Sequence, residues 1–328
     1  MITRLAGVFS KVVGLSVLVV SQASFAGYEG REDVDAFIDD LVSEHQFDRE
    51  SLRAVFKKAE QKESILKAIA RPAEKRLEWA GYRKIFIRDD RIKRGKAFMK
   101  EHAETFARAE AKFGVPKEII AAIIGVETRY GSNKGSYRVI DALATLGFDY
   151  PPRSKFFKSE LKQVFLLARE QGFDVEELKG SYAGAMGYGQ FIPSSYRHYA
   201  VDFDGDNVAD ILNNPVDAIG SVANYFIKHR WKAGQPVAVQ AQYSGAEDSE
   251  LFFKSLKPKH TLADLYEGGV ATLDGLDPTR SARLLRLNAE DGVQHWATFQ
   301  NFYVITRYNH SHLYGMAVFE LSEALRAE

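Results

Sequence analysis

The 328-residue chain contains no cysteine, and this absence removes several classes of chemistry. Disulfide bonds, zinc–thiolate centres, cysteine nucleophiles and lipid attachment to a cysteine are all excluded. The chain also has no excess of charge, because 44 Lys and Arg residues balance 44 Asp and Glu residues. A balanced chain gives no electrostatic reason to expect a nucleic acid as partner. Its 45% hydrophobic and 27% charged residues are typical of a globular protein with one large or two to three small domains.

The sequence begins with the pattern of a secretory signal over residues 1–26. Arg4 and Lys11 supply a positive flank, and the apolar run Val12–Val20 is too short to span a bilayer. Ser24–Ala26 forms a small-x-small cleavage site. The alternative is an uncleaved anchor. We expect a cleaved signal peptide and a mature protein that is soluble in an exported compartment.

The stretch Val115–Gly131 predicts a helix that carries a single acid to its end. Pro116 suits the first helical position, and the apolar residues of Ile119–Val126 recur at helical spacing. Glu127 shares their face. Burial and the negative end of the helix dipole both disfavour a charged carboxylate, so we expect a raised pKa and a role as general acid. On the pattern alone, the alternative is an ion pair between Glu127 and Arg129 or another base at the helix end.

A glycine-rich stretch, Gly180–Tyr196, follows further along the chain. Gly184, Gly187 and Gly189 allow the backbone to approach another group closely. The stretch lacks the glycine spacing and the lysine of a phosphate-binding loop. Tight helix–helix packing is the alternative to a binding loop.

An acidic loop that begins at Asp202 has the spacing of a calcium-binding loop. Position 12 of the loop is Asn213, so the usual bidentate glutamate is missing. We favour a structural calcium ion over an acidic surface turn. The candidate ligands within the loop are Asp202, Asp204, Asp206, Val208 and Asp210.

The remaining segments predict helices in the first part of the chain and strands near its end. Trp79, Tyr82 and Phe86 recur at helical spacing, which indicates core packing or a platform for sugar rings. Residues 237–241, 284–287 and 302–305 favour strands, with turn residues between them. A final helix is expected near the C-terminus.

Residues 127–131, Glu-Thr-Arg-Tyr-Gly, resemble the catalytic motif of the lytic murein transglycosylases, specifically the membrane-bound transglycosylase B family. The similarity extends to the glycine-rich and acidic stretches and covers nearly the whole mature chain. It implies that Asp217 ends an atypical calcium loop, and that Pro152 stands where a second cleft arginine is often found. The residues that it implies to contact the glycan are Tyr82, Arg153, Ser181, Gln190, Tyr225, Tyr308, Asn309 and Tyr314.

The resemblance implies an α+β fold, mostly helical, in which a lysozyme-like catalytic core carries the cleft. We expect an accessory helical region over residues 27–112 and the core, with its calcium-loop-like segment, over 113–234. A small β-containing subdomain over 235–306 and a C-terminal helix over 307–328, packed back on the helical part, complete the predicted arrangement.

The implied activity is cleavage of the β-1,4 bond between N-acetylmuramic acid and N-acetylglucosamine in peptidoglycan, with formation of 1,6-anhydromuramic acid ends. Ordinary glycosidases use two carboxyl groups, whereas the family uses one glutamate as acid and then as base. Two alternatives stay open: a hydrolytic muramidase with Asp141 or Asp149 as second acid, and a non-catalytic peptidoglycan-binding protein. We expect no catalytic cofactor, glycan strands as ligand, other cell-wall enzymes as candidate partners, a monomer and a periplasmic location.

Overall fold

The computed structural model describes residues 27–70 and 77–327, so the expected signal peptide at residues 1–26 lies outside the described residues. The helices are α1 (Glu32–His45), α2 (Arg49–Lys58), α3 (Glu63–Ile69), α4 (Trp79–Phe86), α5 (Asp89–Glu101), α6 (Ala103–Phe113), α7 (Lys117–Thr128), α8 (Val139–Asp149), the 3-10 turn η2 (Pro151–Arg153), α9 (Ser154–Gln171), α10 (Pro193–Tyr199), α11 (Pro215–Lys228), α12 (Leu262–Glu267), α13 (Gln300–Tyr308) and α14 (His312–Arg326). The strands are β1 (Tyr137–Arg138), β2 (Lys179–Gly180), β3 (Ala238–Ala241), β4 (His260–Thr261), β5 (Ser281–Ala289) and β6 (Gly292–Thr298). Within the described part of the chain, no helix combines the length and apolar character that crossing a bilayer requires.

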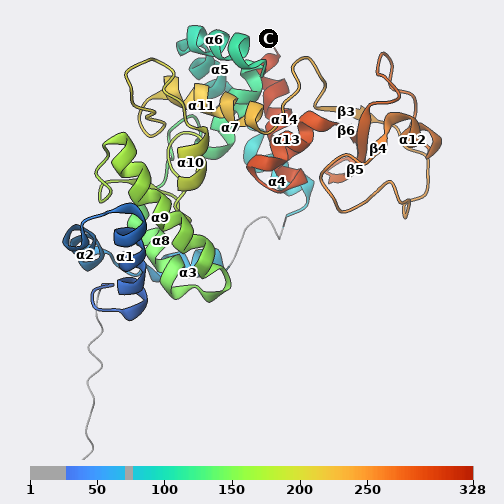
Figure 1. Cartoon of the computed structure of the whole chain (residues 1–328). Coiled ribbons are helices and arrows are strands. Elements are labelled where there is room, and N and C mark those ends of the chain that lie inside the picture. Colours follow the sequence, from blue (N-terminus) through green and yellow to red (C-terminus); the bar gives the residue numbers. More distant parts are fainter. Residues whose placement is uncertain (1–26, 71–76, 328) are drawn as a thin grey trace, which may run out of the picture.

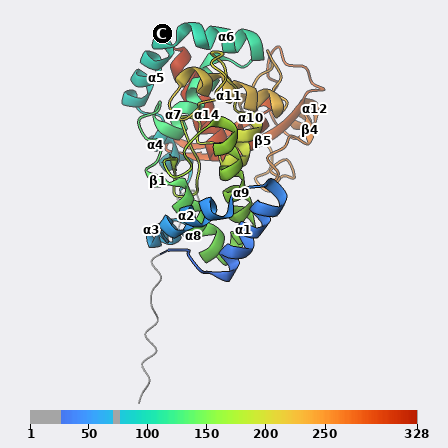
Figure 2. The ribbon, with the colours of Figure 1, turned by 60° about the vertical axis from the view of Figure 1, so that its left-hand side comes forward.

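The helical part has two lobes, which Figures 1 and 2 show from two sides. An N-terminal lobe contains α1–α3 together with α8 and α9, and a core lobe contains α4–α7, α11, α13 and α14. Helix α10 packs on both α9 and α11 and so joins the lobes. The mostly helical α+β fold is therefore as expected. The region 27–112, expected to be one accessory part, contributes to both lobes, and the domain boundaries stay predictions.

The N-terminal lobe is held together by aromatic side chains. Asp48 accepts a hydrogen bond from the Ser51 backbone N–H at 2.8 Å and so caps α2. The ring of Phe148 in α8 receives Phe37 of α1 at 5.8 Å and Phe56 of α2 at 6.1 Å, both edge-on. Because aromatic rings bury large areas and favour edge-to-face contacts, these rings fix α1 and α2 on α8.

Helix α7 lies in the middle of the core lobe. It is buried on every side from Glu118 to Val126, although the sequence predicted only one buried face. The helix begins at Lys117, one residue later than predicted, because Pro116 has an extended backbone and serves as the N-cap. A helix that is apolar all round belongs in a protein interior, and α14 covers much of this one. The C-terminal helix therefore returns to the core.

Helix α7 ends in a run of left-handed residues. Arg129, Tyr130 and Gly131 have φ values of 52°, 59° and 81°, and the Arg129 N–H bonds back to the Gly125 carbonyl at 3.1 Å. A left-handed residue is a common helix stop. Glu127 consequently stands in the last turn of α7, as the sequence predicted.

The β part is an antiparallel sheet with strand order β3-β6-β5-β4. Leu285 of β5 pairs with Trp296 of β6, and α12 packs on β5 over a separate small core. The expected strand over 302–305 is wrong, because these residues lie in α13. A short apolar run does not by itself distinguish a buried strand from a helix. Here Phe302 packs so close to Gly315 of α14 that a Cβ there would lie 2.8 Å from its ring.

Candidate active site

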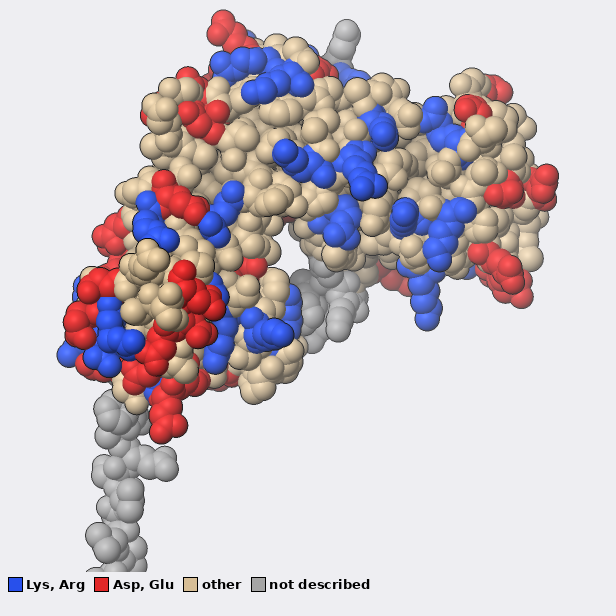
Figure 3. All heavy atoms as spheres, in the orientation of Figure 1, with Lys and Arg blue, Asp and Glu red and all other residues tan. Residues whose placement is uncertain are grey.

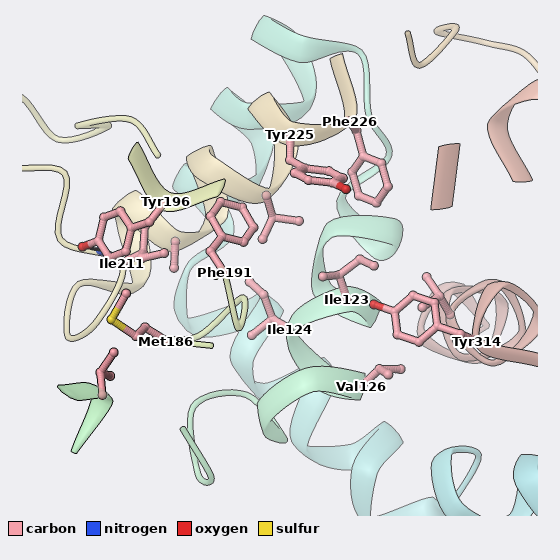
Figure 4. Packing of buried hydrophobic residues seen from close by; sticks show 14 of the residues in the cluster. Ile123, Ile124, Val126, Met186, Phe191, Tyr196, Ile211, Tyr225, Phe226 and Tyr314 are labelled. Atoms are coloured by element: carbon pink, nitrogen blue, oxygen red, sulfur yellow. Dashed lines mark hydrogen bonds between the residues drawn. The ribbon is translucent and has the colours of Figure 1, made fainter. Parts of the chain in front are cut away.

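Glu127 is bound by a tyrosine from the far end of the chain. The hydroxyl of Tyr314, in α14, donates a hydrogen bond of 2.6 Å to Oε1 of Glu127. Tyr314 is 2% exposed, whereas Glu127 is half-buried. Figure 4 shows Tyr314 reaching towards α7 beside Ile123 and Val126. The contact fixes one carboxyl oxygen at the end of an apolar helix, and it depends on α14 returning to α7.

Tyr225, Tyr308 and Tyr314 form a row of neighbouring rings that we call the tyrosine wall. The rings of Tyr308 and Tyr314 are 6.5 Å apart and nearly parallel, and Tyr225 lies 4.7 Å from Tyr308. The Tyr308 hydroxyl donates to the Gly189 carbonyl at 2.6 Å, and the Tyr225 hydroxyl donates to the Arg307 carbonyl at 2.6 Å. Each of the three hydroxyls therefore has a definite acceptor.

The surroundings keep these phenols protonated. Burial raises the pKa of Tyr308 and of Tyr314 well above the ordinary value, and the nearby charge of Glu127 raises both further. Burial likewise raises the pKa of Tyr225. Because ionisation is opposed in this way, the hydroxyl of Tyr314 is a donor to the Glu127 carboxylate rather than a proton source at neutral pH.

Tyr82 and Asn309 lie beside the tyrosine wall, and their glycan contacts stay predictions. Tyr82, in α4, is 4% exposed and packs 5.0 Å from the ring of Phe86. The nearby Tyr82 phenol is one of the groups that raise the pKa of Tyr314. Asn309 follows Tyr308 directly at the end of α13 and is half-buried. The structure thus gathers residues from α4, α13 and α14 around the end of α7.

Ser181 and Gln190 hold the glycine-rich loop in shape. The Ser181 hydroxyl accepts hydrogen bonds from the backbone N–H groups of Ala183 and Ala185. The Gln190 side-chain amide donates to the carbonyls of Lys134 and Gly187, at 3.1 and 3.0 Å. Both side chains are half-buried. Their glycan contacts stay predictions, but their place in the loop is defined.

Sequence reasoning missed the part played by Thr128. Its hydroxyl lies 2.9 Å from the carbonyl of Tyr188 and accepts a hydrogen bond from the Gly131 N–H at 3.0 Å. At Gly131 a Cβ would lie 2.2 Å from the ring of Tyr188, so only glycine fits there. Residues 127–131 therefore carry the acid and also join α7 to the glycine-rich loop. A hydroxyl residue directly after the acid was the available signal.

Arg153 lies away from this group of residues. It is exposed in the turn η2 of the N-terminal lobe, and its guanidinium lies 4.2 Å from the centre of the Phe156 ring. Its guanidinium also lies 5.1 Å from the centre of the Phe157 ring, so the aromatic rings that it contacts belong to α9. Its contact with the glycan stays a prediction.

The two acids considered as partners for Glu127 are engaged elsewhere. Asp141 is 1% exposed and lies 3.4 Å from the guanidinium of Arg138. Asp149 forms an ion pair of 2.7 Å with Arg31. Both acids belong to α8 in the N-terminal lobe. The basic side chains that bind the two acids, Arg138 and Arg31, therefore hold them in that lobe and not at the end of α7.

Four aspartates of the acidic loop converge. Asp202, Asp204, Asp206 and Asp217 each place one carboxylate oxygen so that all four lie within 4.8 Å of one another. Asp217 is fully buried, and burial raises its pKa, with the charges of Asp204 and Asp202 adding to the effect. A set of carboxylate oxygens of this kind matches the ligands that calcium prefers.

Two residues of the predicted metal set do not belong to this group of four. The Asp210 carboxylate accepts hydrogen bonds from the backbone N–H groups of Leu212 and Asn213, at 2.9 and 3.0 Å. It therefore stabilises the turn that leads into α11. Val208 has only its backbone carbonyl to offer as a ligand, and its N–H donates to Asp206.

The chain matches known proteins over most of its length. Residues 29–323 match the family model described as Transglycosylase SLT domain. Membrane-bound lytic murein transglycosylase B of Escherichia coli (strain K12) is 42% identical over 309 residues, which are 91% of this chain and 84% of the relative.

Solved structures agree with this match. The crystal structure of soluble lytic transglycosylase SltB1 from Pseudomonas aeruginosa is 48% identical, with a TM-score of 0.86 over 89% of this chain and 98% of that one. The Escherichia coli lytic transglycosylase Slt35, solved in complex with calcium, is 42% identical, with a TM-score of 0.84 over 93% of this chain and 97% of that one.

Proposed function

The chain belongs to the Transglycosylase SLT domain family and is a lytic transglycosylase that cleaves peptidoglycan, and we propose that Glu127 is its single acid–base group. The observation that carries this proposal is the 2.6 Å hydrogen bond from Tyr314 to the Glu127 carboxyl group. The bond orients the carboxyl group, and the other candidate acids are held by basic side chains in the N-terminal lobe.

In the first step the protonated carboxyl group of Glu127 gives its proton to the glycosidic oxygen. The bond between C1 of N-acetylmuramic acid and that oxygen breaks, and N-acetylglucosamine leaves with a free hydroxyl. The 2-acetamido group of the muramoyl residue assists at C1. General acid catalysis of this kind contributes about 10² to 10⁴ in rate.

In the second step the Glu127 carboxylate takes the proton from the muramoyl O6 hydroxyl. O6 then forms a bond to C1 and closes the 1,6-anhydro ring. The proton given in the first step is thus recovered in the second, and no water is consumed. A second carboxyl group is unnecessary, because the substrate supplies its own nucleophile. Tyr314 serves the carboxylate stage, when its donated hydrogen bond stabilises the negative charge.

We propose that the tyrosine wall, with Tyr82 and Asn309, binds the sugar rings. Aromatic faces stack on pyranose faces, and the rings of the wall pack on one another beside Glu127, which Tyr314 contacts. Ser181 and Gln190 would bind from the glycine-rich loop. Arg153 is kept as a candidate for a more distant sugar.

Digestion of purified sacculi followed by mass spectrometry of the muropeptides tests the reaction. The expected products end in anhydromuramic acid and are lighter by one water than the products of hydrolysis. Muramic acid with a free reducing end as the main product would instead identify a muramidase. Binding to sacculi without any cleavage would identify a non-catalytic peptidoglycan-binding protein.

We further propose that the acidic loop holds a structural calcium ion. Asp202, Asp204, Asp206 and Asp217 offer hard oxygen ligands close together, and the similar Slt35 is known in complex with calcium. The ion would neutralise a group of carboxylates that otherwise repel one another. The ion would have no role in bond cleavage, because carboxylates bound to calcium act neither as proton donors nor as nucleophiles towards the sugar.

The location of the protein is also a proposal. Residues 1–26 have the charge, length and cleavage site of a secretory signal, and its removal would place the enzyme in the periplasm beside its substrate. N-terminal sequencing of the exported protein should begin at Gly27. Retention of the first 26 residues would contradict this.

A further inference from the structure

A cavity of about 540 Å³ lies between the β5–β6 hairpin and the helices α4 and α14. Helix α4 packs on both β5 and α14, as can be followed in Figure 1. Elements that are far apart in the chain are thus held around one space, which we call the hairpin cavity. One aromatic side chain, Trp296, lines it together with the amides of Gln240 and Gln294.

The sheet presents this aromatic ring and both amides on one face. Trp296 of β6 pairs with Gln240 of β3, and Gln294 lies two residues before Trp296 on the same strand. Cross-strand partners and residues two apart project from the same side of a sheet. Phe319 of α14 packs edge-on against the Trp296 ring at 6.0 Å, and the ring is only half-buried. The ring is therefore fixed in place and still accessible.

The cations of the hairpin cavity are paired with acids of the same cavity. Nε of Arg83 lies 2.6 Å from a carboxylate oxygen of Glu320, and Nζ of Lys84 lies 2.9 Å from Glu290. Figure 3 likewise shows charges of both signs over the visible face of the β part. Because the positive charges already have partners, the cavity favours an uncharged polar ligand over an anion.

An aromatic face flanked by amides matches the chemistry of a sugar. The apolar face of a pyranose ring stacks on an aromatic ring, and its hydroxyl and acetamido groups exchange hydrogen bonds with amide side chains. The hydrogen bonds of Gln294 to Asp291 and Trp296 are long, at 3.4 Å each, so a ligand can compete for this amide. The cavity volume of about 540 Å³ lies in the range of sites for small molecules.

The hairpin cavity is separate from the tyrosine wall, although α14 contributes to both. Glu320 follows Tyr314 by six residues, which places it roughly 9 Å further along α14 and about a third of a turn around it. On α4, Arg83 lines the cavity and follows Tyr82 directly, and successive residues of a helix point about 100° apart. A sugar in the cavity therefore does not take the place of a sugar beside Glu127.

We propose that the hairpin cavity is a second carbohydrate site, which binds sugar rings of a glycan strand away from the bond that is cleaved. The inference goes beyond the proposed function, because this site holds glycan without acting on it. Binding the polymer at a second point raises the effective concentration of further strand at Glu127. The β part would thus keep the enzyme on its insoluble substrate between cleavages.

The fluorescence of Trp296 provides a test at the site itself. The other two tryptophans, Trp79 and Trp231, are 1% and 5% exposed, so acrylamide should quench mainly Trp296. We expect the tetramer of β-1,4-linked N-acetylglucosamine, a neutral probe, to protect the wild-type protein from this quenching. In Gln240→Ala with Gln294→Ala, the probe concentration at half protection should rise about fivefold or more, because two hydrogen-bonding amides are lost.

The matched control is Gln61→Ala with Gln242→Ala, which removes two exposed amides outside the cavity. It should keep the wild-type concentration at half protection, and equal melting temperatures check that both variants are folded. Absence of protection in the wild type would overturn the proposal. The same concentration at half protection in the wild type and in Gln240→Ala with Gln294→Ala would also overturn it.

Activity measurements separate the second site from the cleavage site. On sacculi, Gln240→Ala with Gln294→Ala should raise KM about three- to fivefold and leave kcat unchanged, because a tether is lost while Glu127 is intact. On a soluble tetrasaccharide, whose few rings are occupied at the cleavage site, both constants should stay within about twofold. An equal rise of KM on both substrates, or no rise on sacculi, would overturn the proposal. If the wild type released no anhydro products, the proposed function would fail, and the quenching test would still decide the cavity.

Discussion

Two acidic sites of the molecule, at the end of α7 and in the loop before α11, have opposite surroundings. At the end of α7 a single acid, Glu127, is oriented by the hydroxyl of Tyr314 among buried aromatic rings. In the loop before α11, four aspartates converge within 4.8 Å of one another. A lone carboxyl group with a neutral donor is free to take and give a proton, whereas four carboxylates close together repel one another and match the oxygen ligands that calcium prefers. The first arrangement suits chemistry and the second suits structure.

The largest effect is expected from Glu127→Gln, which keeps the shape of the side chain but removes its acidity. We expect activity on sacculi to fall by about 10⁴ or more, the upper end for general acid–base catalysis, because one residue serves both steps. The melting temperature should change little, since an amide is no harder to bury than a carboxylate.

Glu118→Gln is the matched control, because Glu118 stands in the first turn of the same helix and lies 3.7 Å from Arg326. It should keep its activity. A Glu127→Gln enzyme close to wild-type activity would remove the catalytic assignment.

The next effect is on stability and concerns the four aspartates. Calcium at about 100 times its dissociation constant should add about 2.7 kcal/mol to the free energy of unfolding and raise the melting temperature by about 5 °C. Asp202→Ala should abolish most of this gain while the folded enzyme still cleaves sacculi. Scanning calorimetry with calcium and with chelator measures it.

Asp210→Ala serves as the control for that experiment, because its carboxylate caps a turn outside the group of four. It should retain most of the calcium-dependent gain. Equal melting temperatures of the wild type with calcium and with chelator would count against the ion. Loss of catalysis in folded Asp202→Ala would contradict the assignment of a structural role to the acidic loop and a catalytic role to Glu127 alone.

A smaller effect is expected from Tyr314→Phe, which removes the hydrogen bond to Glu127. Hydrogen bonds to charged groups contribute about 1.5–3 kcal/mol, so kcat should fall about 10- to 150-fold. Tyr225→Phe removes a hydroxyl from the same wall that donates to the Arg307 carbonyl instead, and its effect on kcat should be smaller. Equal losses of kcat in the two variants would show that the wall acts as a whole and that Tyr314 has no special part.

The smallest effect concerns the positive charge of protonated His229, whose ring stacks on Tyr225 of the tyrosine wall. Burial lowers the pKa of His229, and the nearby charges of Arg307 and His198 lower it further. The folded state then binds fewer protons than the unfolded state, whose histidine titrates near 6.5. This contribution to stability is present above about pH 6.5 and is lost as the pH falls below it.

His229→Gln should therefore lessen the drop in melting temperature between pH 7.5 and pH 5.5. Other histidines shift in the same direction, so the substitution removes only one share. An unchanged drop in the variant would mean that the surroundings of His229 do not oppose its positive charge.

The local features of the chain could be predicted from the sequence. The acid at the end of an apolar helix and the strand around residues 284–287 both follow from patterns of a few residues. Such patterns express local physics, namely helical spacing, capping and alternation. The prediction of a strand at 302–305 was wrong because local patterns have limits. A four-residue apolar run is compatible with a strand or a helix, and here the packing of α14 accompanies the helix.

The sequence alone determined the family motif, the lone acid and the acidic loop, since each is written in neighbouring residues. The tertiary structure decided which distant groups meet them. Tyr314 reaches Glu127 across 187 positions because α14 returns to cover α7. Asp217 joins the loop from α11, and Asp210, though nearer in sequence, turns away to cap its own turn. Long-range packing makes these choices, because only the folded core fixes which side chains share a buried space.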